Sequence, residues 1–149
     1  MAPTNSKTKH KPEITKVWEE VLDLVIPYLH DIDDRNSVSL VSRKSYEIDG
    51  ITRKRLTVHT LYYPNPASLN KRFPFIEALT LKGPPSNFNV TDDYDIQITP
   101  WIEQLALEFR CLKELHIRGL VVCDEDLETL AKTRGLSFFE ADPVQVDTE

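Results

Sequence analysis

The sequence predicts a mostly α-helical fold with short parallel strands, as at the start of an α/β solenoid. Three observations support this prediction. From Ile14 onward, apolar residues recur at spacings of three and four, as they do on one face of a helix. After Arg55 a run rich in β-branched residues indicates a strand. Two later segments, residues 76–81 and 112–117, then match each other position by position.

The helices of the first part are predicted over residues 14–54. Residues 1–13 form a polar tail with too few apolar side chains to fold. Pro27 lacks an amide hydrogen and its ring would meet the carbonyl of residue 23, so the first helix should kink or fray there. A cluster of aspartates offers an N-cap for the second helix, and a third is expected over residues 44–54. Helices this short cannot each bury an apolar stripe, so they must pack together or against a partner.

Residues 55–135 are predicted to form repeated strand–helix units. The strands are expected at residues 55–61, 76–81 and 112–117, and the helices at 67–72, 99–110 and 124–134. The matched strand positions are Ile76, Leu79 and Leu81 against Leu112, Leu115 and Ile117. They follow the L-x-x-L-x-L pattern of leucine-rich repeats, of which two to three units are expected. Leu79 and Leu115 are 36 residues apart, and the excess over a usual repeat of about 20–29 residues falls in the loop from Pro84 to Ile98.

The C-terminal residues 136–149 show no strand signature and are predicted to be an unpatterned tail. Solenoid repeats bury their core against neighbours and need caps at both ends. The three helices can cap the first repeat, but no cap follows the last. The chain is therefore expected to stop where a solenoid would continue.

Composition limits the possible functions. A net charge of −6 argues against nucleic-acid binding, and no run approaches the roughly 18 apolar residues of a membrane span. Cys111 and Cys123 are expected to be buried or half-buried free thiols. The four histidines have no metal-ligand spacing with them, and no phosphate loop or nucleophile–base pair is visible. We therefore expect protein partners, no metal and no catalytic residues.

Residues 19–49, EEVLDLVIPYLHDIDDRNSVSLVSRKSYEID, resemble the F-box of the plant hormone-receptor F-box/leucine-rich-repeat proteins. That family includes the auxin receptor and the jasmonate (coronatine-insensitive) receptor. The resemblance continues through KRFPFIEALTLKG, TPWIEQL and VVCDEDLETLAK and spans roughly Val17 to Arg134. The segments ITRKRLTV and DLETLAK are closer to the jasmonate type.

The resemblance implies a non-catalytic substrate-recognition subunit of a Skp–cullin–F-box ubiquitin ligase. In this family the F-box helices bind a Skp-type adaptor, and the solenoid holds a hormone against a repressor degron. By motif match, the adaptor contact is placed on Val21, Leu22, Val25, Ile26, Leu29, Asp34, Arg35, Ser37, Val38, Leu40 and Val41. An F-box offers apolar anchors to a partner groove. Half of these residues would equally suit the internal core of three helices, and the sequence does not separate the two sets.

The chain departs from the family pattern inside the F-box. The family carries C-x-x-W where this chain has Ser42-Arg43-Lys44-Ser45. Loss of a buried ring commonly costs about 3–5 kcal/mol when nothing fills the space. Weaker adaptor binding is expected as a result.

A second departure lies in LKGPPSNFNV, residues 81–90. By the resemblance, Lys82 keeps the place of an inositol-phosphate contact, Phe88 that of a pocket aromatic, and Arg118 that of one member of a basic pair. The second basic residue is replaced by Gly119, the loop is shorter, and the arginine of the jasmonate pocket has no counterpart. A polyphosphate site relies on several converging cations. The inositol-phosphate or hormone site is therefore expected to be degenerate, with inositol polyphosphate a cofactor of intact family members only.

The chain is thus predicted to be a truncated F-box/leucine-rich-repeat protein of jasmonate-type signalling. It would act in the nucleus, or otherwise the cytosol, and be limited to binding the Skp-type adaptor, with no nucleic-acid or membrane partner. Two alternatives stay open: a non-functional or decoy fragment that competes with intact receptors, and a leucine-rich-repeat interaction module without a ligase role. A hormone-dependent repressor-binding receptor would need the rest of the solenoid and the pocket arginine.

Overall fold

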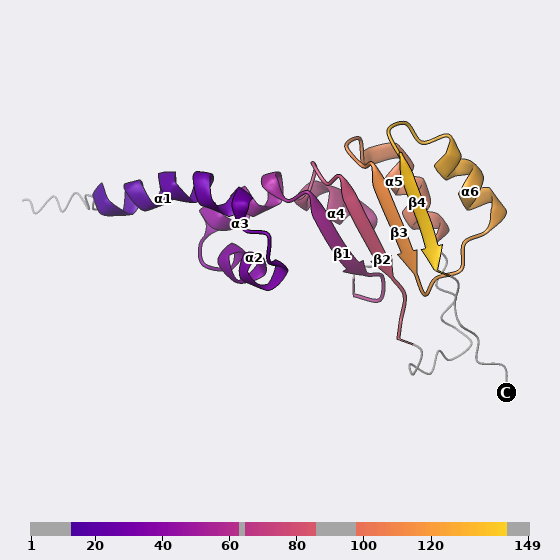
Figure 1. Cartoon of the computed structure of the whole chain (residues 1–149), viewed down its shortest axis with the longest axis horizontal. Helices are drawn as coiled ribbons and strands as arrows, with labels where there is room; N and C mark the ends of the chain where they lie inside the picture. Colours follow the sequence, from indigo (N-terminus) through magenta and orange to yellow (C-terminus); the bar gives the residue numbers. More distant parts are fainter. Residues whose placement is uncertain (1–12, 63–64, 86–97, 143–149) are drawn as a thin grey trace, which may run out of the picture. The chain divides into compact units, whose positions relative to one another are not determined.

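The computed structural model describes residues 13–62, 65–85 and 98–142 (Figure 1). They form six α-helices, one 3-10 helix and four strands. The chain divides into two compact units between Asp49 and Gly50. The division predicted from the sequence, after residue 54, lies slightly later. The predicted polar tail lies outside the described residues except for Glu13, the first residue of α1.

The first unit begins with α1 (Glu13–Val25), which is followed directly by a 3-10 turn, η1 (Ile26–Tyr28). The predicted effect of Pro27 is confirmed, because the α-helix ends at Val25 and only this tighter turn continues it. Helix α2 (Ile32–Ser39) follows. Its N-cap is Asp31, whose Oδ1 accepts hydrogen bonds at 2.9 Å from the backbone N–H groups of the second and third residues of the helix.

Helix α3 (Arg43–Thr52) carries Gly50 close to its end. Glycine costs a helix about 1 kcal/mol relative to alanine, and the structure shows why it stands there. Gly50 is buried, and a Cβ at this position would lie 2.6 Å from the carbonyl oxygen of Arg72. The close approach of the Arg72 backbone therefore excludes a side chain.

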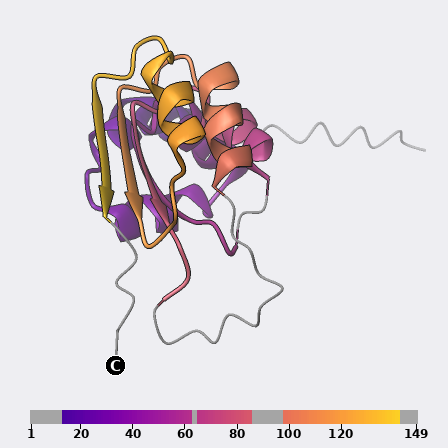
Figure 2. The same ribbon diagram turned by 90° about the vertical axis from the view of Figure 1, so that its right-hand side faces the viewer.

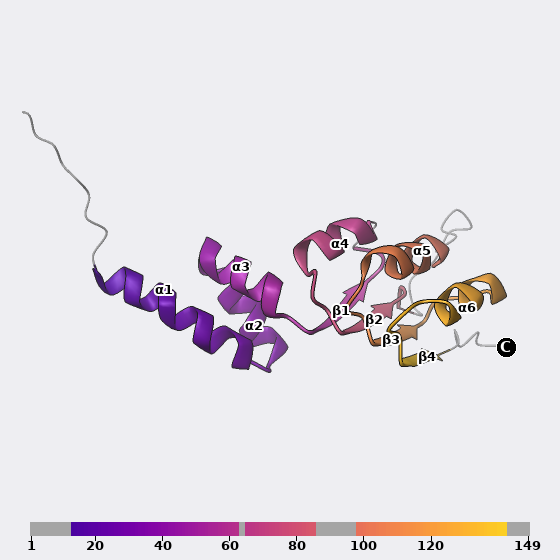
Figure 3. The same ribbon diagram turned by 90° about the horizontal axis from the view of Figure 1, so that it is seen from above.

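The second unit holds a four-stranded parallel sheet in the order β1 (Arg55–His59), β2 (Ala78–Lys82), β3 (Glu114–Arg118) and β4 (Phe138–Asp142). Helices α4 (Pro66–Arg72), α5 (Thr99–Glu108) and α6 (Asp124–Ala131) connect successive strands. Figure 3 shows the three helices in one layer and the strands in another, and Figure 2 shows α5 and α6 on the same side of the sheet. The predicted α/β solenoid start, with its parallel strands, is confirmed.

The prediction that no strand follows Gly135 is wrong, because β4 pairs in parallel with β3. Leu115 is aligned with Phe139, and Ile117 with Ala141. The unit length from β3 to β4 is 24 residues (114 to 138), close to the 23 residues (55 to 78) from β1 to β2. The leucine pattern does not predict this strand, because phenylalanine and alanine occupy positions where the preceding strand has leucine and isoleucine.

The hydrophobic core lies between the sheet and its helices. Leu79, Leu81, Leu115 and Ile117 point inward from β2 and β3 and are fully buried. Helix α5 covers them with Trp101, Ile102 and Leu105. Among the described residues, nineteen apolar side chains are buried, and only Ile26 and Ile48 belong to the first unit. The first unit therefore has few buried apolar side chains of its own.

Candidate functional site

Helix α1 exposes an apolar stripe. Its side chains Val17, Trp18, Val21, Leu24 and Val25 are all exposed, with Leu24 at 71% and Trp18 at 65%. At about 100° per residue, these five positions cover an arc of about 120° on the helix. A helix of a globular protein normally buries such a stripe. Here the stripe is available to a partner.

Further exposed apolar side chains lie beyond α1. Tyr28 ends η1, Ile32 begins α2, and Leu40 and Val41 follow α2. Leu40 and Val41 are 82% and 77% exposed. Together with the α1 stripe they form what we call the exposed apolar set: Val17, Trp18, Val21, Leu24, Val25, Tyr28, Ile32, Leu40 and Val41. Exposed apolar side chains in such number are typical of interaction surfaces on soluble proteins.

The predicted adaptor-contact residues fall into three groups by burial. The exposed ones are Val21, Val25, Asp34, Ser37, Leu40 and Val41, and the half-buried ones are Leu22, Leu29 and Val38. Ile26 and Arg35 are buried, so the structure assigns these two to the interior. The sequence-based set missed Trp18, Leu24, Tyr28 and Ile32. For Leu24 and Tyr28 the helical spacing from Val17 was the available signal.

Arg35 is internal because it pairs with Asp49. Its Nε donates a hydrogen bond to Asp49 Oδ1 at 2.7 Å, and the side chains are 10% and 2% exposed. The pair joins α2 to α3. Arg35 therefore supports the arrangement of these helices and is not offered to a partner.

Ser42 and Ser45, which replace the cysteine and tryptophan of the family pattern, meet at the start of α3. Ser45 donates its backbone N–H to Ser42 Oγ at 3.1 Å, and the two hydroxyl oxygens are 2.8 Å apart. Ser45 is fully buried. Ser42 thus acts as an N-cap, which adds a polar contact where the family pattern has an aromatic ring.

A separate pocket of about 540 Å³ lies at the carboxyl ends of β1, β2 and β3. It is lined by His59, Leu61, Tyr62, Lys82, Gly83, Pro84, Pro85, Arg118 and Gly119. The structure thus brings together Lys82 and Arg118, two of the three residues predicted for a ligand site, and aligns them in register on β2 and β3. Phe88, the third, lies outside the described residues.

The charge of Arg118 in the sheet-end pocket is partly neutralised by a nearby acid. Asp142, the last residue of β4, places Oδ2 3.4 Å from Arg118 Nε. The backbones of Gly83 and Gly119 also approach each other closely beside this pocket. A Cβ at Gly83 would lie 2.8 Å from the carbonyl carbon of Gly119. These contacts weaken the case for a polyphosphate site.

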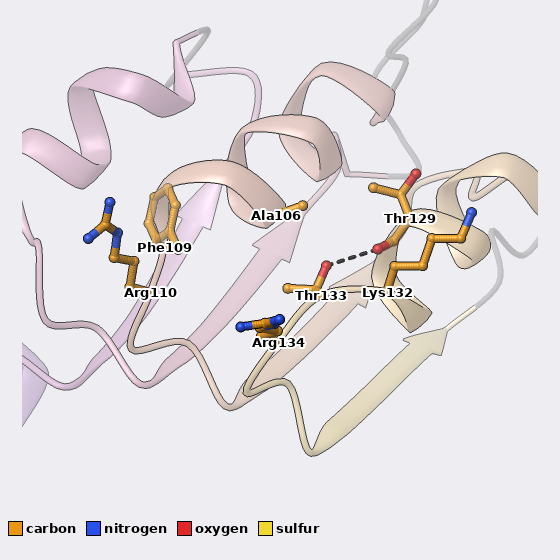
Figure 4. A pocket seen from close by; sticks show the side chains of 7 residues that line it. All are labelled: Ala106, Phe109, Arg110, Thr129, Lys132, Thr133 and Arg134. Carbon is orange, nitrogen blue, oxygen red and sulfur yellow. Dashed lines mark hydrogen bonds between the residues drawn. The ribbon is translucent and has the colours of Figure 1, made fainter.

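Another pocket, of about 490 Å³, lies between the C-terminal ends of α5 and α6 (Figure 4). Its lining includes Arg110, Lys132 and Arg134, with Thr133 donating a hydrogen bond to the backbone oxygen of Thr129 at 2.9 Å. Cations at helix C-termini interact favourably with the helix dipole. Lys132 is the C-cap residue of α6 and fits that role, whereas Arg110 and Arg134 lie two and three residues beyond the ends of α5 and α6.

Both cysteines are free thiols. Cys111 is half-buried, as predicted, but Cys123 is exposed because it lies just before α6 at the surface. A hydrogen bond to the Asp126 carboxylate raises the pKa of the Cys123 thiol, which lowers its thiolate fraction at neutral pH. Within the described ranges, no cluster of three or more potential metal ligands is found. Nor is any helix there long and apolar enough to cross a membrane.

Comparison with known proteins agrees with the helical part of the site. Residues 14–55 match the F-box family profile. Coronatine-insensitive protein homolog 1b of Oryza sativa subsp. japonica is 43% identical over 120 residues, which are 78% of this chain and 20% of the relative. Coronatine-insensitive protein 1 of Arabidopsis thaliana is 38% identical over 119 residues, with the same coverage of 78% and 20%. GRR1-like protein 1 of Arabidopsis thaliana is 39% identical over 115 residues, 75% of this chain and 20% of that protein.

Residues 14–55 are therefore an F-box. Over about four-fifths of its length the chain is similar to coronatine-insensitive proteins, so the resemblance recognised in the sequence is confirmed. The chain spans about a fifth of the length of the relatives it matches.

Proposed function

We propose that this chain is a non-catalytic subunit of a Skp–cullin–F-box ubiquitin ligase and binds a Skp-type adaptor through its exposed apolar set. One observation carries the proposal: the F-box helices expose more large apolar side chains than they bury. The F-box match identifies the kind of partner that such a surface fits.

The energetics favour a hydrophobic contact. Fully burying one large aliphatic or aromatic side chain contributes about 1.5–3 kcal/mol. The most exposed apolar side chains of the described F-box include Leu40, Val41, Leu24 and Trp18. Most of their apolar surface is still in contact with water, so burying it in a complex would supply most of that free energy. Several such anchors are needed to offset the entropy lost on association.

The test is binding of the purified chain to a purified Skp-type adaptor, measured by calorimetry. The double variant Leu40→Asp/Val41→Asp should bind at least about 100-fold more weakly, because two buried carboxylates oppose docking. Val121→Asp is the control, since Val121 is 71% exposed but lies in the second unit. Adaptor binding that is absent in the parent chain, or equal in both variants, would contradict the proposal.

A finer proposal concerns jasmonate-type signalling in the nucleus. It is supported by the names of the relatives and by the convergence of Lys82 and Arg118 on one pocket. The pairing of Arg118 with Asp142 favours a role limited to adaptor binding over hormone capture. Coronatine-dependent retention of a repressor peptide would contradict that limit, and a fluorescent fusion excluded from nuclei would contradict the location.

The decoy alternative makes a different prediction. A chain that binds the adaptor without a substrate should displace an intact coronatine-insensitive protein from it. A competition assay with labelled intact receptor measures this directly. A leucine-rich-repeat module without a ligase role would leave the receptor–adaptor complex unchanged at any concentration.

A further inference from the structure

The pocket between the C-terminal ends of α5 and α6 gathers positive charge. Arg110 lies in the segment after α5, whereas Lys132 and Arg134 lie at and after the end of α6 (Figure 4). All three residues are exposed, and none of the described residues that line the pocket is acidic. The whole chain carries a net charge of −6, so this local excess of cations runs against its composition. Such an excess favours an anionic ligand.

The charge of Lys132 is largely offset within the fold. Lys132 is the C-cap residue of α6, where the helix dipole places partial negative charge. Its Nζ also lies 3.9 Å from Oε2 of Glu128, one turn earlier in the helix. The positive charge that is left for a ligand therefore comes mainly from the two arginines.

Arg110 and Arg134 are not offset in this way. Within the described ranges, neither forms an ion pair with a carboxylate. Both lie beyond the last helical turn, outside which the effect of the helix dipole falls off. Each guanidinium has five N–H donors in a planar fork that matches two oxygens of a phosphate group. Two such forks beside one pocket suit a doubly charged phosphate better than a singly charged carboxylate.

The hydroxyl groups of the pocket are already used as donors. Thr129 Oγ1 donates a hydrogen bond to the backbone oxygen of Glu125 at 3.0 Å, and Thr133 Oγ1 donates one to the backbone oxygen of Thr129 at 2.9 Å. Neither hydroxyl has a second hydrogen to offer to an anion. Recognition of a phosphate group would therefore depend on the arginines.

Part of the pocket wall is apolar and belongs to α5. It consists of Ala106 and Phe109, the C-cap residue of that helix. The volume of about 490 Å³ falls within the roughly 300–1,000 Å³ of small-molecule sites. One water takes up about 30 Å³ in the liquid, so a phosphate ion with its four oxygens would fill only part of this space. A ligand that joins a phosphate group to an apolar ring would fill more of it.

We propose that the pocket between α5 and α6 binds a phosphate group attached to an apolar body such as an aromatic ring. Arg110 and Arg134 would hold the phosphate oxygens, and the ring would lie against Ala106 and Phe109. The site belongs to the second unit, on the side of the sheet where β3 and β4 begin. It is therefore separate both from the exposed apolar set and from the pocket at the carboxyl ends of the strands.

The test is an NMR titration of the 15N-labelled full chain with phenyl phosphate. We expect saturable shifts in residues 106–110 and 129–134, and their absence would overturn the proposal. Benzoate, which has one charge, and inorganic phosphate, which lacks the ring, should each bind several-fold more weakly. Equal binding of either would overturn the assigned ligand chemistry. A blocked phosphotyrosine peptide that binds more tightly than phenyl phosphate would show that a protein carries the phosphate group, and weaker binding would show that a small molecule does.

Variants of the two arginines test the assigned contacts. Arg110→Gln/Arg134→Gln should weaken the binding of phenyl phosphate at least roughly tenfold, because the charge-assisted hydrogen bonds of both forks are lost. The matched control is Arg43→Gln/Lys71→Gln, which makes the same change of net charge at exposed positions of α3 and α4. Equal weakening by the two double variants would show non-specific attraction and overturn the proposal. Ala106→Glu leaves every cation in place but adds a carboxylate to the pocket wall, so unchanged binding by this variant would equally overturn it. None of these outcomes depends on adaptor binding.

Discussion

At the scale of single residues, the contact between Arg35 and Asp49 has the largest expected effect on stability. The two side chains are buried and their charged atoms are 2.7 Å apart. The pair joins α2, which carries part of the exposed apolar set, to α3. Burial makes each charge dependent on its partner, because neither is compensated by water.

Asp49→Ala should therefore destabilise the F-box helices by about 3–5 kcal/mol, since it leaves a buried guanidinium without its carboxylate. Glu47→Ala is the control, because Glu47 pairs with Arg43 at 3.4 Å on the surface and should cost less than about 1 kcal/mol. Amide hydrogen exchange in residues 32–49 measures both effects. Equal losses of protection would contradict a special role for the buried pair.

Glu77 gives the second unit a pH-dependent contribution. Hydrogen bonds from Lys113 and then Lys54 hold the pKa of its carboxyl below 4.5. A lowered folded-state pKa stabilises the fold above the unfolded value, and that contribution is lost as the pH falls through the folded value. Glu77→Gln should thus lower the melting temperature at pH 7. The difference from the parent should shrink as the pH falls below the unfolded-state pKa and vanish once the pH lies below the lowered folded-state pKa. Glu103→Gln should show no such convergence.

At the scale of elements, α3 combines a favourable start with an unfavourable residue near its end. Ser42 caps the first turn through the N–H of Ser45, whereas Gly50 reduces helix propensity. The glycine is retained because the Arg72 backbone occupies the space that a side chain would need. Tertiary packing overrides local preference here.

Gly50→Ala should accordingly destabilise the chain, although an alanine in an exposed helix gains about 1 kcal/mol. The new methyl group must displace the Arg72 carbonyl, and overpacking typically costs about 1–3 kcal/mol. Thermal unfolding of the variant measures the sign. Glu103→Ala, at an exposed position of α5, serves as a reference for an ordinary surface change. A stabilised Gly50→Ala variant would show that the backbone moves freely at this contact.

At the scale of the whole molecule, burial is unevenly distributed. The second unit contains seventeen of the nineteen buried apolar side chains of the described chain, and the F-box helices contain two. Hydrophobic burial is the main favourable term in folding. The two units should therefore differ in local stability.

We expect faster amide exchange in α1 and α2 than in β2 and β3 of the free chain. Addition of a Skp-type adaptor should slow exchange in residues 17–41, because a ligand stabilises the state to which it binds. Exchange in β2 and β3 should change far less. Protection that appears only in the sheet would place the adaptor on the second unit and contradict the proposed contact with the F-box helices.

The sequence was most informative where structure depends on neighbours in the chain. Asp31 as an N-cap, the break at Pro27, and the buried leucines of β2 and β3 all follow from local pattern. The features that the sequence did not predict depend on contacts between residues far apart in the chain. Arg35 seemed available to a partner because Asp49 lies fourteen residues away on another helix. Strand β4 was not predicted because Phe139 and Ala141 stand where β3 has Leu115 and Ile117, which breaks the leucine pattern.

The exposed apolar set has a consequence for the life of the protein in a cell. Apolar patches that remain uncovered are recognised by chaperones and proteases, which act continuously on incompletely buried chains. We therefore expect the amount of this protein to follow the supply of its adaptor rather than its own rate of synthesis. Pulse–chase labelling with the adaptor depleted and overproduced would measure that dependence, and an unchanged half-life would exclude it.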